Sequence, residues 1–291
     1  VEWEPRSGTR GFHIPKRTGK ILTTFRELGV LPEIADALER AGITTPFPIQ
    51  EMTLSVALMG TDLIGQARTG TGKTLAFAIP VIQRTVAPHD PDYDQLAAPG
   101  KPQALIVTPT RELTIQVAKD IDTASAKRGT RNLTIYGGVP YEPQLDMLKS
   151  GVDIVVGTPG RLLDLANRGA LDLSHVKSLV LDEADEMLDL GFLPDVEAIL
   201  AKTPELRQTM LFSATMPGAI VTYLTDVIGS VSSVSEAVDR ASVVYPDIAV
   251  FDIRLAGRRD GDVDTRAGPR RHACERSLHR SQRDAGRRYT S

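Results

Sequence analysis

Two short segments of the chain carry the residue types that bind a nucleoside triphosphate. One is a glycine-rich stretch that ends in Lys73 and Thr74, and the other is Asp182-Glu183, which directly follows the apolar run 178–181. Lysine and threonine at the start of a helix can contact phosphates and Mg²⁺. A carboxylate at the end of a buried strand points to the edge where parallel sheets bind ligands. The two segments together indicate a site for a nucleoside triphosphate with its magnesium ion.

The glycine-rich stretch lies between a strand candidate at 61–64 and an apolar run at 75–79 that favours a helix, which is the context that a P-loop requires. We expect residues 65–72 to form a loop whose N–H groups point at phosphate oxygens, reinforced by the helix dipole. The consensus is not met literally, because Ala67 stands at the first glycine position, and a chance Gly-Lys-Thr is the alternative for this motif alone. The predicted nucleotide-binding residues here are Ala67, Thr69, Gly70, Thr71, Gly72, Lys73 and Thr74.

The acidic pair has separate predicted roles. Asp182 and Thr74 are expected to hold Mg²⁺, and Glu183 is expected to orient or deprotonate the attacking water. The alternative is an ordinary acidic helix start, since acids favour the positive end of the helix dipole. Two independent half-sites on suitable elements argue against that alternative.

Further motifs occur in order over residues 21–217, and with the two segments above they resemble the DEAD-box family of ATP-dependent RNA helicases. Segment 42–50 is similar to the adenine-reading Q motif of that family, and Ser213-Ala214-Thr215 to the motif that couples the nucleotide and RNA sites. The resemblance implies that Phe25 stacks on adenine, that Gln50 reads its edge, and that Lys73, Asp182, Glu183, Ser213 and Thr215 serve catalysis.

The resemblance also implies ATP as substrate, Mg²⁺ as cofactor and RNA as partner. Between the two nucleotide segments lie matches to the family motifs that contact the RNA backbone. The implied RNA-binding residues are Pro109, Thr110, Arg111, Gly137, Gly138, Thr158, Pro159, Gly160 and Arg161.

These residues also have a physical interpretation of their own. The amide of Gln50 carries a donor and an acceptor that suit the N6/N7 edge of adenine, although a lone Gln after a Pro-rich turn is more often a surface residue. Phe25 taken alone is more often a packing residue than a base platform. The RNA motifs follow apolar β-branched runs, so their N–H groups, hydroxyls and arginines can bind phosphates without reading bases. The alternative there is ordinary strand-to-helix turn chemistry.

Two positions depart from the family pattern. The family usually has Thr or Ser where this chain has Phe47, so a hydroxyl contact toward the P-loop is lost or replaced. Thr114 stands where the family commonly has Ala, and we expect no consequence from it.

Short apolar runs alternate with helix-like stretches, which predicts an α/β fold with a mainly parallel sheet covered by helices on both faces. The resemblance makes this a RecA-like P-loop domain. Residues 90–101 are expected to form an exposed loop. The predicted strands are 61–64, 104–108, 132–136, 153–157, 177–181 and 208–212, and the predicted helices are 31–41, 73–85, 111–126, 160–168, 193–201 and 217–228.

Composition is consistent with this domain. A chain of 291 residues that is 41% hydrophobic can bury one full core, and no apolar run approaches the length of a membrane span. The single cysteine, Cys274, excludes a disulfide framework and fits a reducing cytoplasm. With His272 it could supply two metal ligands at best. No membrane partner is expected, and the sequence does not specify protein partners.

The termini differ from the predicted domain at 21–230. Residues 1–20 are expected to be flexible, and 231–253 is a connecting segment without an assigned structure. Residues 254–291 contain eleven Arg, no Lys and five acids, a net charge of 11 − 5 = +6. Such a tail could bind RNA. The competing interpretation is a reading frame out of register, because nothing after Pro217 resembles the second domain of the family; we therefore expect a truncated or frameshifted product.

The leading functional prediction is an ATP-binding helicase core domain that couples ATP binding and hydrolysis to RNA binding and local unwinding, with weak or no activity alone. Two alternatives stay open. One is a non-enzymatic nucleotide- or RNA-binding module, and the other is a different P-loop ATPase such as a DNA translocase, which would respond to DNA at least as well as to RNA.

Overall fold

The computed structural model of the chain describes residues 23–215 and the strand 248–252. The chain divides into two units, residues 1–256 and 257–291, and all described residues belong to the first. The segment 1–20, the predicted helix 217–228 and the Arg-rich tail therefore lie outside the described residues, and the predictions made for them stay predictions.

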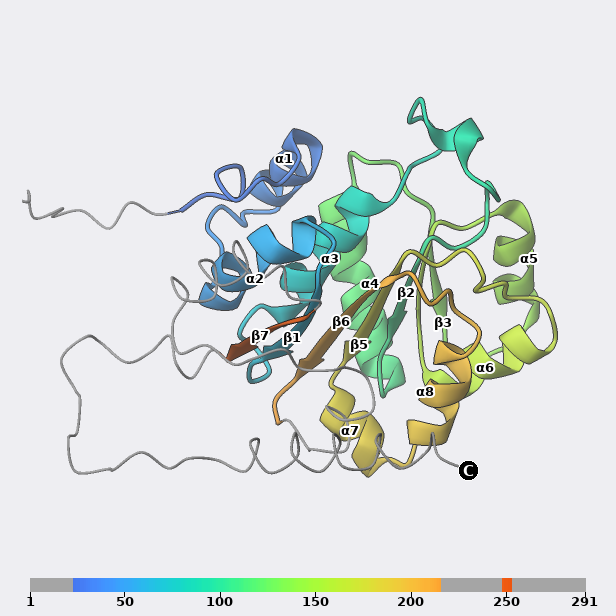
Figure 1. Ribbon diagram of the computed structural model, residues 1–291. Coiled ribbons are helices and arrows are strands. Elements are labelled where there is room, and N and C mark those ends of the chain that lie inside the picture. Colours follow the sequence, from blue (N-terminus) through green and yellow to red (C-terminus); the bar gives the residue numbers. More distant parts are fainter. Residues whose placement is uncertain (1–22, 216–247, 253–291) are drawn as a thin grey trace, which may run out of the picture. The chain divides into compact units, whose positions relative to one another are not determined.

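Seven strands form one sheet in the order β3-β4-β2-β5-β6-β1-β7, and every neighbouring pair is parallel (Figure 1). The six predicted strands are all present, with ends that differ from the prediction by two residues or fewer. β7 lies in the segment 231–253, for which the sequence predicted no strand, and it pairs with β1 at the edge of the sheet. The strands are β1 (Asp62–Gln66), β2 (Ala104–Val107), β3 (Asn132–Ile135), β4 (Ile154–Gly157), β5 (Ser178–Asp182), β6 (Gln208–Ser213) and β7 (Ile248–Asp252).

Helices cover both faces of the sheet, which confirms the predicted fold class. Successive strand residues point to opposite faces, so Ala104 and Ile106 of β2 join one apolar cluster and Leu105 and Val107 join the other. The first cluster includes residues of α1 to α4, and the second is covered by α5 to α8. The helices are α1 (Pro32–Arg40), α2 (Pro48–Leu58), α3 (Lys73–Arg84), α4 (Arg111–Ser125), α5 (Glu142–Ser150), α6 (Pro159–Asn167), α7 (Ala184–Asp189) and α8 (Leu193–Leu200).

Five helices were predicted to within one residue at each end, but α2, α5 and α7 were missed. Helix α2 begins at Pro48, and most of its residues are buried, so it lacks the polar face that makes a helix recognisable in sequence. Helix α5 is mainly polar, with only Gln144 fully buried. None of the described helices is long and apolar enough to span a lipid bilayer.

The start of the predicted loop needs a correction. Gly65 and Gln66 belong to β1, whereas the sequence assigned residues 65–72 to a loop. A Cβ atom added to Gly65 would lie 2.6 Å from the ring of Phe212, so only glycine leaves room for that ring against β1. Phe212 also packs on Phe77 of α3, with ring centroids 5.3 Å apart. This packing fixes the base of the glycine-rich loop against the core.

Candidate functional site

The segments with predicted chemistry meet at one edge of the sheet. Strands β5, β6 and β1 are neighbours and parallel, so their C-terminal ends lie side by side. The glycine-rich loop follows β1, Asp182 is the last residue of β5, and Ser213 is the last residue of β6. Open parallel sheets bind ligands at this edge.

The glycine-rich loop has the backbone of a phosphate-binding loop. Gly70 and Gly72 have φ angles of 81° and 87°, in the left-handed region that favours glycine. Gly72 is the N-cap of α3, so Lys73 and Thr74 lie in the first turn, and Thr71 donates a hydrogen bond to the Arg68 carbonyl at 2.6 Å. The start of the loop is tied to β6, because the Ala67 N–H donates to the Ser213 carbonyl at 3.0 Å. Thr69 and Gly70 are exposed.

The ammonium group of Lys73 points into this site without an adequate partner. Lys73 is only 6% exposed, and within residues 23–215 its Nζ finds no hydrogen-bond acceptor. The nearest opposite charge is Glu183, whose Oε1 lies 4.0 Å away. A buried ammonium without an acceptor is costly. The oxygens of a phosphate group are acceptors of the kind that this site lacks.

Asp182 is a second buried charge beside Lys73. It is 2% exposed, and burial raises its pKa to about 7, although Lys73 opposes the shift and Glu183 adds to it. Its Oδ1 accepts a hydrogen bond from the Glu183 N–H at 3.0 Å. A carboxylate in this setting favours a nearby cation. Among the described residues no group of three or more His, Cys, Asp or Glu side chains could hold a metal ion.

Glu183 occupies an unusual backbone conformation. With φ of 53° it is the one non-glycine residue with a positive φ in the described part of the chain, a position that costs on the order of 1–2 kcal/mol. Its Oε1 accepts a hydrogen bond from the Thr69 hydroxyl at 3.3 Å. The strained turn directs the carboxylate toward the loop that carries Lys73. The side-chain hydrogen bond between Glu183 and Glu186 raises the pKa of Glu186.

Asp185 connects the end of β5 to the end of β6, and the sequence analysis missed it. Its N–H donates to the Ser213 hydroxyl at 3.1 Å, and its Oδ2 accepts from the N–H and hydroxyl of Thr215 at 2.9 and 2.8 Å. Burial favours a higher pKa for Asp185, but the hydrogen bonds from Ser213 and Thr215 outweigh burial and lower it. The signal was present, since Asp185 is the third acid of the segment 182–185.

The predicted RNA motifs lie on the other half of the same edge. Each follows the C-terminal end of β2, β3 or β4, and these strands are neighbours in the order β3-β4-β2. Arg111 is exposed at the start of α4, with its guanidinium 4.9 Å from the ring centre of Tyr136. Thr110 caps the same helix by accepting a hydrogen bond from the Leu113 N–H at 3.3 Å. The structure thus brings Pro109, Thr110, Arg111, Gly137, Gly138, Thr158, Pro159, Gly160 and Arg161 to one rim.

Arg161 is engaged within the protein. Its guanidinium donates to the Gln144 side chain at 3.3 Å and to the Val139 carbonyl at 3.0 Å, and it lies 3.9 Å from the ring centre of Tyr141. These contacts brace the loop after β3, which contains Gly137 and Gly138. Direct contact between Arg161 and RNA phosphate stays a prediction.

Comparison with known proteins identifies the family of the chain. The family model described as DEAD/DEAH box helicase matches residues 47–222. The chain belongs to this family. It is 48% identical over 199 residues to the DEAD-box ATP-dependent RNA helicase CshA of Geobacillus kaustophilus, an alignment that covers 68% of this chain and 40% of the relative. It is 50% identical over 195 residues to the mitochondrial DEAD-box ATP-dependent RNA helicase 9 of Arabidopsis thaliana, covering 67% and 31% respectively.

Solved structures of the DEAD-box family share the fold. A DEAD box protein from Methanococcus jannaschii has a TM-score of 0.63 and 37% identity, with 79% of this chain and 55% of that chain covered. A hypothetical ATP-dependent RNA helicase from Sulfolobus tokodaii has a TM-score of 0.58 and 34% identity, with 76% and 56% covered. These likenesses confirm the RecA-like fold. The chain spans only part of the length of these relatives.

The structure places the two residues predicted to contact adenine in the interior of the domain. Phe25 is 3% exposed and belongs to the same core cluster as Val30 and Ile34, and stacking of its ring on a base stays a prediction. Gln50 is fully buried, with Oε1 accepting from the Phe47 N–H at 2.9 Å and Nε2 donating to the Gly72 carbonyl at 2.8 Å. Adenine reading by Gln50 stays a prediction, and it requires that these bonds be exchanged.

Thr114, expected to have no consequence, does have a structural role. It is fully buried and its hydroxyl donates to the Thr110 carbonyl at 2.8 Å. The Thr108 hydroxyl oxygen lies 2.7 Å from the hydroxyl oxygen of Thr114. Because the one Thr114 proton is used, Thr108 is the donor of that second bond. The relay fixes the loop between β2 and α4, and alanine at this position would leave Thr108 without it.

Proposed function

We propose that this chain is the ATP-binding core domain of an ATP-dependent RNA helicase and couples ATP binding and hydrolysis to RNA binding and local duplex unwinding. The observation that carries the proposal is the buried Lys73 ammonium, which finds no acceptor among residues 23–215 and lies beside Asp182 and Glu183. The names of the relatives support the same activity. The domain extent predicted at 21–230 is part of this proposal, with β7 added through its pairing with β1.

The nucleotide half of the site uses the chain's own groups as follows. N–H groups of the glycine-rich loop and the Lys73 ammonium bind the β- and γ-phosphates. Thr74 and Asp182 would hold Mg²⁺, which would neutralise phosphate charge. Glu183, turned toward Lys73 by its backbone, orients the attacking water. Ala67, Thr69, Gly70, Thr71 and Gly72 shape the cradle, and Gln50 holds its last glycine.

The RNA half of the site binds the sugar-phosphate backbone. Loops after parallel strands present N–H groups and hydroxyls in a row, and such contacts do not read bases. Asp185 donates a hydrogen bond to Ser213 and accepts two from Thr215, which connects the nucleotide acids to the end of β6, and we assign these bonds the coupling role. The single cysteine of the chain supports the cytoplasm as its location.

The test is ATP binding and hydrolysis with and without single-stranded RNA, for the chain and for Lys73→Ala. Loss of two charge-assisted hydrogen bonds to phosphate, each worth about 1.5–3 kcal/mol, predicts at least about a 100-fold weaker ATP affinity. Lys149→Ala, which changes a 76% exposed side chain on α5, is the matched control and keeps wild-type affinity.

The outcomes separate the competing functions. RNA-stimulated hydrolysis supports the proposal, and equal or stronger stimulation by single-stranded DNA favours a translocase. ATP binding without hydrolysis in any nucleic acid favours a passive binding module. Unchanged ATP affinity of Lys73→Ala overturns the assignment of the phosphate site.

A further inference from the structure

An exposed aromatic ring lies against the phosphate loop. Phe47 is the N-cap residue of α2 and is 53% exposed. A Cβ atom added to Gly72 would lie 2.8 Å from Cδ2 and 3.2 Å from Cβ of Phe47, so the ring is next to the last glycine before Lys73. The exposure is unusual, because no other phenylalanine within residues 23–215 is exposed to this extent.

The position of Phe47 is set by hydrogen bonds and not by burial. Gln50 accepts from the Phe47 N–H at 2.9 Å and donates to the Gly72 carbonyl at 2.8 Å, so one amide links the start of α2 to the phosphate loop. Pro48 fixes the first turn of the helix after it. The ring is therefore held beside the loop while much of its surface is left to solvent. Such a preorganised apolar surface favours a ligand that can cover it.

Two groups of side chains contact the end of the loop, and they differ in chemistry. Asp182 and Glu183 lie on the side where Lys73 meets the acids, which suits the terminal phosphate, Mg²⁺ and water. Phe47 and Gln50 contact Gly72 from α2. A phenyl ring cannot hydrogen-bond a phosphate, so the part of a nucleotide that suits Phe47 is the nucleoside. Phe25, the aromatic residue predicted to stack on the base, is 3% exposed, whereas Phe47 is 53% exposed.

We propose that Phe47 packs on the nucleoside of the bound nucleotide and supplies apolar contact where a hydroxyl contact to the phosphate loop was expected. This inference rests on the proposed function, since it requires that the phosphate loop bind a nucleotide. The contact discriminates nucleotides from inorganic polyphosphate. It does not discriminate among bases, because every base offers a π-face.

The first test compares Mg-ATP with inorganic tripolyphosphate, by calorimetry, for the chain and for Phe47→Ala. Loss of one aromatic contact, about 1–2 kcal/mol, predicts a roughly 5- to 30-fold weaker ATP affinity and an equal loss for GTP relative to its own wild-type value. Tripolyphosphate affinity stays within about twofold, which also shows that the phosphate loop is intact in the variant. Met59→Ala is the matched control, because Met59 is an exposed apolar residue directly after the same helix and leaves ATP affinity unchanged.

A spectroscopic test uses Phe47→Trp. Trp3 is the single tryptophan of the chain, so in a Trp3→Phe background the new indole is the one reporter. ATP is expected to quench its fluorescence and to bind with near wild-type affinity, and tripolyphosphate leaves the fluorescence unchanged.

The results distinguish failure of the inference from failure of the proposed function. If ATP binds and Phe47→Ala weakens neither ATP nor GTP, or weakens tripolyphosphate by the same factor, the inference is wrong and the proposed function stands. If the unaltered chain binds neither ATP nor tripolyphosphate, both are overturned.

Discussion

Where β2, β3 and β4 begin, the buried charges Asp153 and Arg128 are paired, whereas at the opposite edge Lys73 has no acceptor within residues 23–215. The two sites belong to the same parallel sheet but lie at different strands and at opposite strand ends. At the first, both carboxylate oxygens of Asp153 accept hydrogen bonds and Arg128 binds Asp90, although the Nε of Arg128 has no acceptor among the described residues. At the second, a buried ammonium and a strained backbone lie beside the phosphate loop. The difference indicates that the polar groups at the start of β3 and β4 serve internal pairing, whereas those at the ends of β1 and β5 suit a ligand.

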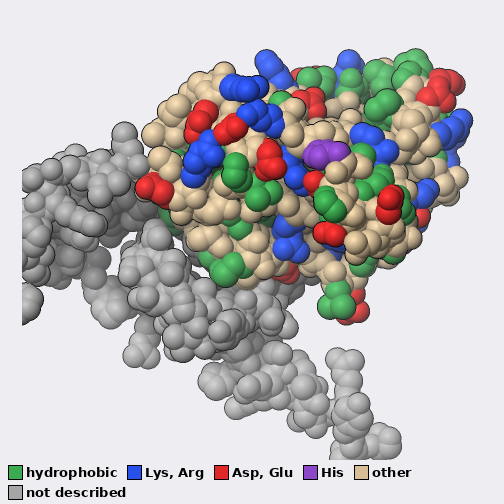
Figure 2. All heavy atoms as spheres, turned by 90° about the horizontal axis from the view of Figure 1, so that it is seen from above, with side chains coloured by type: hydrophobic (Ala, Val, Ile, Leu, Met, Phe, Trp, Pro, Cys, Tyr) green, Lys and Arg blue, Asp and Glu red, His purple; other side chains and the backbone are tan. Residues whose placement is uncertain are grey.

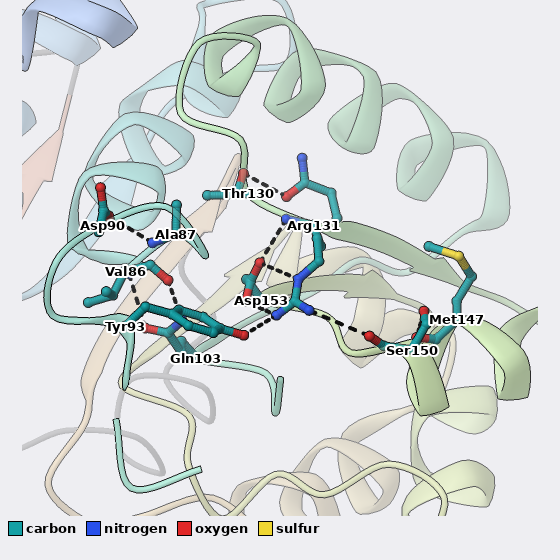
Figure 3. Close-up of polar contacts among 11 residues, drawn as sticks. Val86, Ala87, Asp90, Tyr93, Gln103, Thr130, Arg131, Met147, Ser150 and Asp153 are labelled. Atoms are coloured by element: carbon teal, nitrogen blue, oxygen red, sulfur yellow. Dashed lines mark hydrogen bonds and ion pairs between the residues drawn. The ribbon is translucent and has the colours of Figure 1, made fainter. Parts of the chain in front are cut away.

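The N-terminal edge is organised around a buried carboxylate (Figure 3). Asp153 is fully buried, and its Oδ2 accepts from the N–H and Nε of Arg131 at 2.8 and 3.0 Å, while Oδ1 accepts from Nη2 at 2.8 Å. The hydrogen bond to Asp153 raises the pKa of Arg131. Arg131 also donates to the Tyr93 hydroxyl, which ties the loop 90–101 to β3 and β4. That loop was predicted only to be exposed.

A second pair anchors the other end of the same loop. Arg128 donates to both carboxylate oxygens of Asp90, at 3.2 and 2.6 Å, and to the Thr85 carbonyl at 3.2 Å. Figure 2 views the side on which α1 and this loop lie, and there Lys and Arg side chains are interspersed with Asp and Glu. Interspersed charges of both signs favour internal pairing over the binding of a polyanion.

The largest expected effect is at the C-terminal edge, in the variant Asp182→Asn. The pKa of Asp182 is about 7 in the folded state against an ordinary 3.8, so the folded protein binds the extra proton between these values and loses stability as pH rises through that window. The full difference corresponds to on the order of 4 kcal/mol. Urea unfolding at pH 4.5 and pH 8 is expected to show this loss in the original chain and not in Asp182→Asn. If the free energy of unfolding depends on pH equally in the two proteins, Asp182 is not the source of the pH dependence.

The next largest effect is expected at the N-terminal ends of the strands, in the variant Arg131→Ala. Arg131→Ala leaves Asp153 buried without its guanidinium, and we expect a loss of roughly 3 kcal/mol in the free energy of unfolding. The matched control is Lys149→Ala, which breaks the exposed pair with Asp146 and costs less than about 0.5 kcal/mol. The measurement is urea unfolding at one pH. ATP affinity is expected to be unchanged in Arg131→Ala at a temperature where it is folded, and a large change would mean that the two edges are not independent.

The smallest expected effect is an increase in the free energy of unfolding. Glu183→Gly relieves the left-handed backbone at φ 53° and removes a carboxylate next to Asp182, so we expect a gain of about 0.5–1 kcal/mol in stability together with loss of hydrolysis. Glu183→Gln keeps the strained backbone and separates the two causes. If both variants gain equally, the stored energy is electrostatic and not conformational.

The elements that could be predicted from the sequence are those specified by residues that are contiguous in the chain. Six of the seven strands were predicted to within two residues, because apolar β-branched runs bounded by Gly and Pro depend only on neighbouring residues, whereas β7 was not predicted. The phosphate loop was recognisable for the same reason, since its glycines and the helix after them are contiguous. Helix α2 was missed because its side chains are buried on most sides, and only packing against α3 and β1 explains that pattern.

The sequence by itself determined the fold class, the strand-end positions of the motifs and the types of group that meet a triphosphate. Tertiary structure alone decided what each side chain does there. It buried Phe25, exposed Phe47 and tied Gln50 to Gly72. The physical reason is that burial and hydrogen-bond partners depend on which distant segments pack together, as when Gly72 meets α2 across 22 residues of chain. A sequence motif identifies the type of side chain, and tertiary packing determines its exposure, its charge and its hydrogen-bond partners.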